Sequence, residues 1–137
     1  MALPGYVEVS RRDRSVGENR GGIILFAQHN LHNIVCTQKS SDVERAWHYL
    51  HLDIGSIGIC NWYRPGSTGI EHILSLQDEL AEIRDDVIGV VILGDMNIHH
   101  SRWLRHSNGN TPEGALLKQI SDDYGLKQIV DVPTRGM

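Results

Sequence analysis

The stretch VIGVVILGDMNIHH, residues 87–100, joins an apolar run to a group of polar side chains. Val87–Leu93 has the nearly unbroken, β-branched apolar composition of a strand that is buried on both faces. Directly after it come Gly94, Asp95, Asn97 and two adjacent histidines. Ligands of α/β proteins collect at the carboxyl ends of strands. The stretch therefore predicts either an ordinary polar turn behind a core strand or a functional site at the tip of that strand.

The composition is that of a single globular domain. The chain has 137 residues, of which 40% are hydrophobic and 22% are charged, close to the averages of folded domains. No apolar run approaches the ~20 residues that a membrane span needs, and no signal peptide is visible. Cys36 and Cys60 form no CxxC pair and favour buried thiols in a reducing, intracellular compartment. We expect no membrane partner, and nothing in the sequence indicates a homo-oligomer.

The formal net charge is −4, which argues against broad coating of nucleic acid, because that needs a basic face. An enzyme that acts on phosphodiesters stays compatible with this charge, because bound metal ions supply the positive charge of acidic sites. Arginines gather near the N-terminus, at positions 11, 12, 14 and 20. This group is typical of either a solvated hairpin or a patch that contacts phosphate.

Strands come first along the chain, and strands and helices then alternate. Apolar or alternating runs predict strands at 5–12, 21–28, 34–37, 54–63, 87–95 and 126–132. The strands at 21–28 and 34–37 flank the tight, polar segment HNLHN and are expected to pair as a hairpin. This order of elements indicates a mixed α/β fold.

Two segments are predicted to be helices. Residues 69–84 carry an apolar stripe at helical spacing, made of Ile70, Ile73, Leu74, Leu76, Leu80 and Ile83. The second helix starts at Thr111-Pro112-Glu113 and has Gly125 as its C-cap.

Residues 40–53, SSDVERAWHYLHLD, fit two patterns. The apolar residues Val43, Ala46, Trp47 and Leu50 recur at helical spacing and favour a helix. The residues from Ala46 to Leu52 also alternate between two faces, as in a strand. Periodicity alone favours the helix here.

Asp95 and Asn97 are the first candidates for chemistry. In an extended continuation of the strand, residues two apart point the same way. Asp95 can orient or deprotonate a water, or protonate a leaving oxygen. Asn97 can donate to a phosphoryl oxygen whose charge grows in the transition state. The alternative is that both side chains satisfy backbone groups in a turn.

Tyr63 and Arg64 end the strand that precedes the first helix. In a strand–helix–strand crossover, two parallel strands place their carboxyl ends at the same edge of the sheet. The Tyr63 hydroxyl is therefore expected near Asp95 and Asn97, as a donor to a phosphate. Taken alone, Tyr63 is more typical of a half-buried strand aromatic, and only its spacing to Gly94-Asp95-Met96-Asn97 favours the functional interpretation. Arg64 is a candidate for substrate binding.

The adjacent His99 and His100 do not predict a metal site, because neighbouring side chains face different directions and cannot easily chelate one ion together. We expect both histidines to form hydrogen bonds within their loop or to line a substrate groove.

Four blocks carry a resemblance to a known family. They are GGIILF at 21–26, WYRP at 62–65, VVILGDMNIHHSRW at 90–103 and GLKQIVDVPTRG at 125–136. Together they resemble the endonuclease/exonuclease/phosphatase superfamily, and they are most similar to the endonuclease domains of LINE-type (non-LTR) retrotransposons. The resemblance covers the chain from about Gly5 to Gly136.

The resemblance implies an α/β (α+β) fold, which in this family is a four-layer αββα sandwich. It also implies an enzyme that cleaves phosphodiesters of DNA with Mg²⁺. Such an enzyme would act in the nucleus if the mobile element is functional. The resemblance implies that Tyr63 positions the scissile phosphate, that Asp95 activates water or protonates the leaving group, and that Asn97 holds the phosphate. It also makes residues 44–52 a strand against their periodicity, because tertiary burial overrides a weak local preference.

Two motifs of the family have no counterpart in this sequence. The family carries an Asn and a Gln-Glu motif near its N-terminus, whose Glu binds the metal, and a Ser-Asp-His motif near its C-terminus. We therefore expect residues 1–137 to be a partial domain, incomplete at both ends, with the Mg²⁺ ligands largely missing. Gly66 replaces the second Pro that is usual in the subgroup.

Three functions stay open on this basis. The first is a Mg²⁺-dependent DNA endonuclease of which this chain is a part. The second is a catalytically inactive remnant or a weak nucleic-acid-binding module. The third is a phosphatase or deadenylase of the same superfamily.

Overall fold

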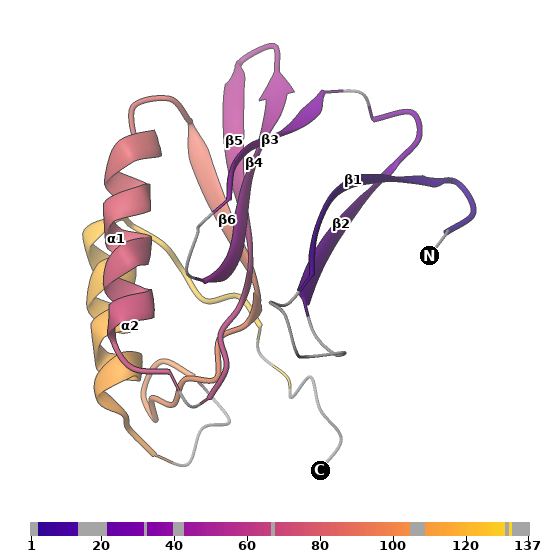
Figure 1. Cartoon of the computed structure of the whole chain (residues 1–137). Helices are drawn as coiled ribbons and strands as arrows, with labels where there is room; N and C mark the ends of the chain where they lie inside the picture. The colour runs from indigo at the N-terminus through magenta and orange to yellow at the C-terminus, as the bar shows by residue number, and fades with distance from the viewer. Residues whose placement is uncertain are drawn as a thin grey trace. The chain divides into compact units, whose positions relative to one another are not determined.

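The computed structural model describes residues 3–13, 22–31, 33–39, 43–66, 68–104, 109–130 and 132 (Figure 1). Six strands and two helices follow one another in these residues: β1 (Tyr6–Asp13), β2 (Gly22–Gln28), β3 (Ile34–Lys39), β4 (Glu44–Leu52), β5 (Gly55–Tyr63), α1 (Glu71–Ile83), β6 (Gly89–Asp95) and α2 (Pro112–Asp123). The mixed α/β class that the sequence predicts is confirmed.

The chain forms two compact units. The first unit comprises Met1–Arg64 and Glu82–Met96, and it contains all six strands. The second unit comprises Pro65–Ala81 and Asn97–Met137, and it contains α2 and most of α1.

The first unit holds two sheets. β1 and β2 form an antiparallel pair, and the other sheet has the order β3-β4-β5-β6. Within the larger sheet β3, β4 and β5 are antiparallel, while β5 and β6 are parallel. The predicted hairpin of residues 21–28 and 34–37 is therefore wrong, since β2 pairs with β1 and β3 pairs with β4. A short polar segment can connect two strands of different sheets as well as two strands of one hairpin. Which of the two forms depends on the strands with which each of them pairs.

The ambiguous segment is strand β4, as the resemblance implies and against its periodicity. Four consecutive residues of this strand are buried, namely Arg45, Ala46, Trp47 and His48. Because neighbouring strand residues face opposite sides, burial of all four means that both faces of β4 are covered. A strand covered on both faces loses its alternating pattern, which is why the apolar spacing resembles that of a helix.

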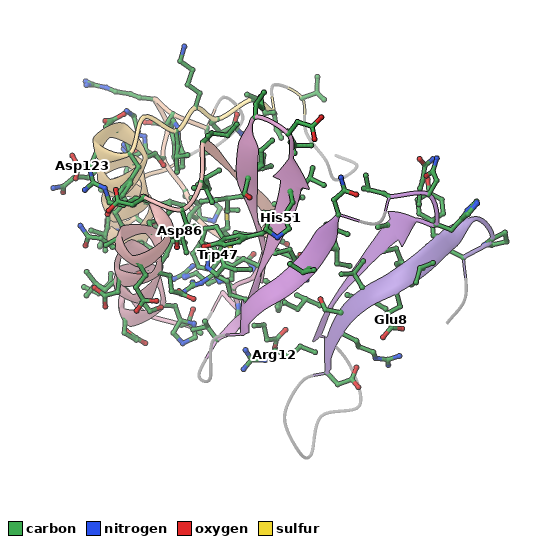
Figure 2. All side chains as sticks on the ribbon, turned by 90° about the horizontal axis from the view of Figure 1, so that it is seen from above. Glu8, Arg12, Trp47, His51, Asp86 and Asp123 are labelled. Atoms are coloured by element: carbon green, nitrogen blue, oxygen red, sulfur yellow. The ribbon has the colours of Figure 1, made fainter. Side chains whose placement is uncertain are left out.

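Polar side chains link the two sheets. The hydroxyl of Ser10 on β1 and Nε2 of the buried His48 on β4 form a hydrogen bond of 2.6 Å. The Asn61 amide on β5 donates to the carbonyl of Ile24 on β2 at 3.1 Å. Trp47, labelled in Figure 2, is adjacent to His48 and therefore lies on the opposite face of the larger sheet.

Ser10→Ala is expected to lower the free energy of unfolding by about 1–2 kcal/mol, because a buried imidazole nitrogen loses its partner. Ser56→Ala is the matched control, since Ser56 bonds His51 Nδ1 at 2.7 Å on the surface, where water replaces the hydroxyl. Its expected effect is below about 0.5 kcal/mol. Urea unfolding followed by tryptophan fluorescence measures both, and equal losses would argue against the inter-sheet role of Ser10.

β6 is not buried on both faces, and that prediction is wrong. Val91 and Leu93 are 42% and 48% exposed, and both lie on the face that also carries Asp95. In the described part of the chain β6 is an edge strand of its sheet, paired with β5 alone. The apolar composition of the segment favours a strand, but the number of elements that pack around the strand decides how much of its surface is buried.

The predicted strand at 126–132 is also wrong. Residues 126–130 form no strand and pair with no described strand. Ile129 and Val130 are 85% and 50% exposed. A strand needs a neighbour for its backbone groups, and an alternating pattern does not supply one.

The two helices form where the sequence places them, and they lie side by side in Figures 1 and 2. Of the predicted stripe of α1, Ile73, Leu76, Leu80 and Ile83 are buried, whereas Ile70 and Leu74 are each 42% exposed. Neither helix is long and apolar enough to cross a bilayer, within the residues that the structure describes.

α2 has both of its predicted ends. Thr111 is the N-cap, and Pro112 opens the first turn. Gly125 follows the helix with a φ of +69°, its N–H bonds the Asp122 carbonyl at 3.3 Å, and the Leu126 N–H bonds the Ser121 carbonyl at 2.7 Å. This pair of bonds is a Schellman motif, in which glycine takes the left-handed position without steric cost.

Candidate active site

Tyr63 and Asp95 are the last residues of β5 and β6 and are partners in their parallel register. Partners in a parallel register sit side by side and project from the same face of the sheet. Both side chains are half-buried. The crossover of residues 55–95 thus brings a phenol and a carboxylate together at one end of the first unit, as the sequence pattern predicts.

Gly94 allows this close pairing. Its φ is +134°, a region that residues with a side chain rarely adopt. A Cβ at this position would lie 1.7 Å from the carbonyl oxygen of Trp62. The glycine of the Gly-Asp pair is therefore a requirement of the backbone, and a glycine inside a strand pattern is the sequence signal for such close approach.

Asn97 is joined to Asp95 through Met96 and begins the second unit. Its φ is 47°, in the left-handed region where Asn is tolerated better than most residues. The backbone is therefore not extended at Asn97, contrary to the extended continuation that the sequence argument assumes. Gly66 lies beside Asn97, because a Cβ on Gly66 would be 3.9 Å from the Asn97 Cβ, an ordinary contact distance.

Arg64 is buried, with 2% of its surface exposed. Its backbone N–H donates to the carbonyl of Asp95 at 2.9 Å. Its Nη1 donates to the carbonyl of Met96 at 3.0 Å. In this structure the side chain thus engages the backbone that follows Asp95, and its contact with substrate stays a prediction.

The loop after Asn97 is attached to the start of α2. The backbone N–H and the hydroxyl of Thr111 both donate to the carbonyl of His99, at 3.1 and 3.3 Å. The Thr111 hydroxyl also accepts the Gly114 N–H at 3.1 Å. A Cβ on Gly114 would lie 2.1 Å from the His99 carbonyl oxygen, so glycine permits this close approach. The His99 side chain itself is exposed.

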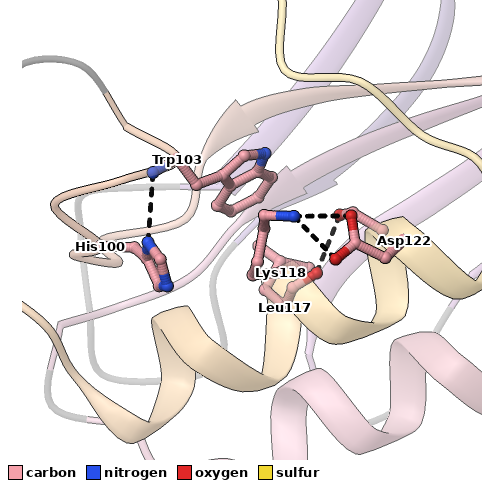
Figure 3. Close-up of polar contacts among 6 residues, drawn as sticks. His100, Trp103, Leu117, Lys118 and Asp122 are labelled. Atoms are coloured by element: carbon pink, nitrogen blue, oxygen red, sulfur yellow. Dashed lines mark hydrogen bonds and ion pairs between the residues drawn. The ribbon is translucent and has the colours of Figure 1, made fainter.

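His100 caps a single helical turn. Its Nδ1 accepts the N–H of Trp103 at 3.2 Å (Figure 3), and its carbonyl accepts the N–H of Leu104 at 2.9 Å. An acceptor at Nδ1 places the proton of the neutral ring at Nε2. Asn110 holds the same loop, because its side-chain oxygen accepts from both the N–H and the hydroxyl of Ser101.

The basic group near the N-terminus is only partly described. Arg11 on β1 donates to Asp13 at 2.8 Å, and this hydrogen bond raises the pKa of the Arg11 guanidinium. The charge of Arg11 is therefore balanced by a residue of its own strand. Arg14, Arg20 and the PTRG block at 133–136 lie outside the described residues.

The described residues do not by themselves form a metal site. Among them there is no group of three or more His, Cys, Asp or Glu side chains that could hold an ion. Mg²⁺ prefers octahedral oxygen ligands, which proteins supply through one or two carboxylates together with water and substrate phosphate. Asp95 offers one such carboxylate at the end of β6.

Comparison with known proteins identifies the fold. No protein-family model matches the chain, and no curated protein sequence matches it. A solved structure does match: the endonuclease domain of TRAS1, a telomere-specific non-LTR retrotransposon, with a TM-score of 0.65 and 17% sequence identity. The match covers 96% of this chain and 59% of that chain. The resemblance to this kind of domain is confirmed at the level of the fold.

Proposed function

We propose that this chain, which has the fold of a retrotransposon endonuclease domain, is part of a Mg²⁺-dependent phosphodiesterase that nicks DNA. The observation that carries the proposal is the register of β5 and β6, which makes Tyr63 and Asp95 neighbours at the carboxyl ends of two parallel strands. A phenol and a carboxylate at such a position suit the binding of a phosphate at the carboxyl ends of the strands.

Each of the three catalytic residues has a distinct role in this proposal. The Tyr63 hydroxyl donates to a non-bridging oxygen and fixes the scissile phosphate. Asp95 takes the proton of the attacking water or gives a proton to the leaving oxygen. Asn97 donates its amide hydrogens to a phosphoryl oxygen, where negative charge builds up in the transition state.

His99 and His100 are proposed to line the path of the substrate. His99 is exposed, and its carbonyl is fixed by Thr111, so its imidazole projects from an anchored backbone. The Nδ1 atom of His100 accepts the hydrogen bond from the Trp103 N–H within the helical turn.

A reading frame extended on both sides of residues 1–137 provides the test. The extended protein is expected to nick supercoiled plasmid with Mg²⁺, and residues 1–137 alone are not. Asp95→Ala and Asn97→Ala should each lower the rate of the extended protein by about 10²-fold or more, because acid–base and electrostatic contributions have that size. Asp53→Ala, at an exposed turn of the same unit, is the control and should keep full activity. Losses of only a few-fold at Asp95 would refute its role.

The second candidate is an inactive module that binds nucleic acid weakly. It is favoured by one observation, the lack of a three-ligand metal group among the described residues. If the extended protein binds DNA but leaves plasmid intact over a range of Mg²⁺ concentrations, this candidate replaces the first.

A further inference from the structure

We infer that Arg64 is a positioning residue, which orients the Asp95 carboxylate by holding the backbone that carries it and does not contact the substrate. Arg64, Asp95 and Met96 all belong to the first unit. The expected effect of Arg64 on catalysis rests on the proposed function, whereas its role in holding the backbone does not.

Arg64 binds two successive carbonyl groups at the end of β6. The backbone N–H bonds the Asp95 carbonyl at 2.9 Å, and Nη1 bonds the Met96 carbonyl at 3.0 Å. These two bonds fix the peptide plane on the C-terminal side of Asp95 and the plane that follows it. The main-chain bond holds the plane next to Asp95, and the Arg64 side chain holds the plane that follows, so the side chain limits how far the end of β6 that carries Asp95 can move.

The local sequence accounts for the inward direction of Arg64. Pro65 restricts the residue before it to extended backbone, so Arg64 continues the alternation of β5. Its side chain then leaves on the face opposite to Tyr63. Tyr63 and Asp95 share one face, and Arg64 reaches the carbonyl of Met96 from the other side with 2% exposure.

An arginine that contacted a phosphate would have a different environment. A phosphate ligand presents its guanidinium to solvent in the free enzyme, because the anion must reach it. Arg64 instead directs a donor at a backbone carbonyl and is almost fully covered. The planar guanidinium also has a reach and donor geometry that the point charge of lysine does not reproduce.

The structural part is tested on residues 1–137 by NMR. In the wild type, rotation about the Nε–Cζ bond of Arg64 should be slow and its guanidinium hydrogens protected from exchange. In Arg64→Lys, the amide of residue 64 should exchange at least tenfold faster, and the amide signals of residues 96 and 97 should shift. Arg84→Met is the control, because Arg84 is exposed and its ion pair with Asp85 is 3.9 Å long. Fast rotation of the wild-type Arg64 guanidinium would overturn the inference, even if the variant does not fold.

The chemical part is tested in the extended protein. Misplacement of a catalytic group by about 1 Å can cost about 10²-fold in rate. Arg64→Lys should therefore lower kcat by about that factor, while KM stays within about twofold and the salt dependence of DNA binding is unchanged. A lost phosphate contact would instead raise KM in Arg64→Met and reduce the slope of log K against log salt by about 0.9. Full activity of Arg64→Lys together with a reduced slope in Arg64→Met would identify Arg64 as a substrate ligand. If the extended protein is inactive, the proposed function fails and the NMR result still decides the role of Arg64.

Discussion

Gly94→Ala is expected to lower the free energy of unfolding by about 3–5 kcal/mol, which is a large part of the stability of a domain of this size. The added Cβ would lie 1.7 Å from the Trp62 carbonyl oxygen, which belongs to backbone and cannot rotate away. The φ of +134° adds strain that alanine cannot relieve without moving the strand. The clash can be relieved if β6 moves away from β5 at the end that carries Tyr63 and Asp95.

Thermal and urea unfolding of the variant measure this loss. Gly89→Ala is the matched control, since Gly89 lies in the same strand and a Cβ there meets no atom within 4 Å. Its effect should stay within about 1 kcal/mol of the wild type in either direction. Similar melting temperatures for the two variants would mean that β5 and β6 are not paired as closely as described.

Gly114→Ala is the second substitution with a large expected effect, a loss of about 2 kcal/mol. Helix propensity alone predicts the opposite sign, because alanine is about 1 kcal/mol more favourable than glycine within a helix. The clash decides the sign, since the new Cβ would lie 2.1 Å from the His99 carbonyl oxygen. The carbonyl would have to leave the two donors of Thr111, and the loop of His99 and His100 would move from the start of α2.

The sign of the stability change separates the two effects. Gly109→Ala serves as the control, because a Cβ at Gly109 meets no atom within 4 Å. NMR signals of residues 99–103 should move in Gly114→Ala and stay in place in Gly109→Ala. A stabilised Gly114→Ala would show that the loop is not anchored on α2.

Local signals in the sequence were sufficient for both helices and for the ends of α2. Thr111, Pro112 and Gly125 each act on backbone groups within a few residues, so their effect does not depend on the rest of the fold. The neighbouring positions of Tyr63 and Asp95 also followed from sequence, because a strand–helix–strand unit with parallel strands puts the two strand ends together.

The features that the sequence did not predict depend on distant residues. The periodicity of β4 resembles that of a helix because two layers cover the strand, and no window of sequence contains both layers. The burial of Arg64 depends on a carbonyl of residue 96, which lies beyond the intervening helix. The hydrogen bond of His100 within its loop, by contrast, is local and was among the expectations from the sequence.

Within the described residues β6 has one neighbour, β5, and its other edge affects the behaviour of the chain in solution. From Gly89 to Leu93 the strand carries no charged residue and no proline, the two devices by which edge strands commonly resist pairing with other molecules. Val91 and Leu93 add an exposed apolar surface to that edge. Another extended segment would gain both backbone hydrogen bonds and apolar burial by adding to it, so self-association competes with folding as the protein concentration rises.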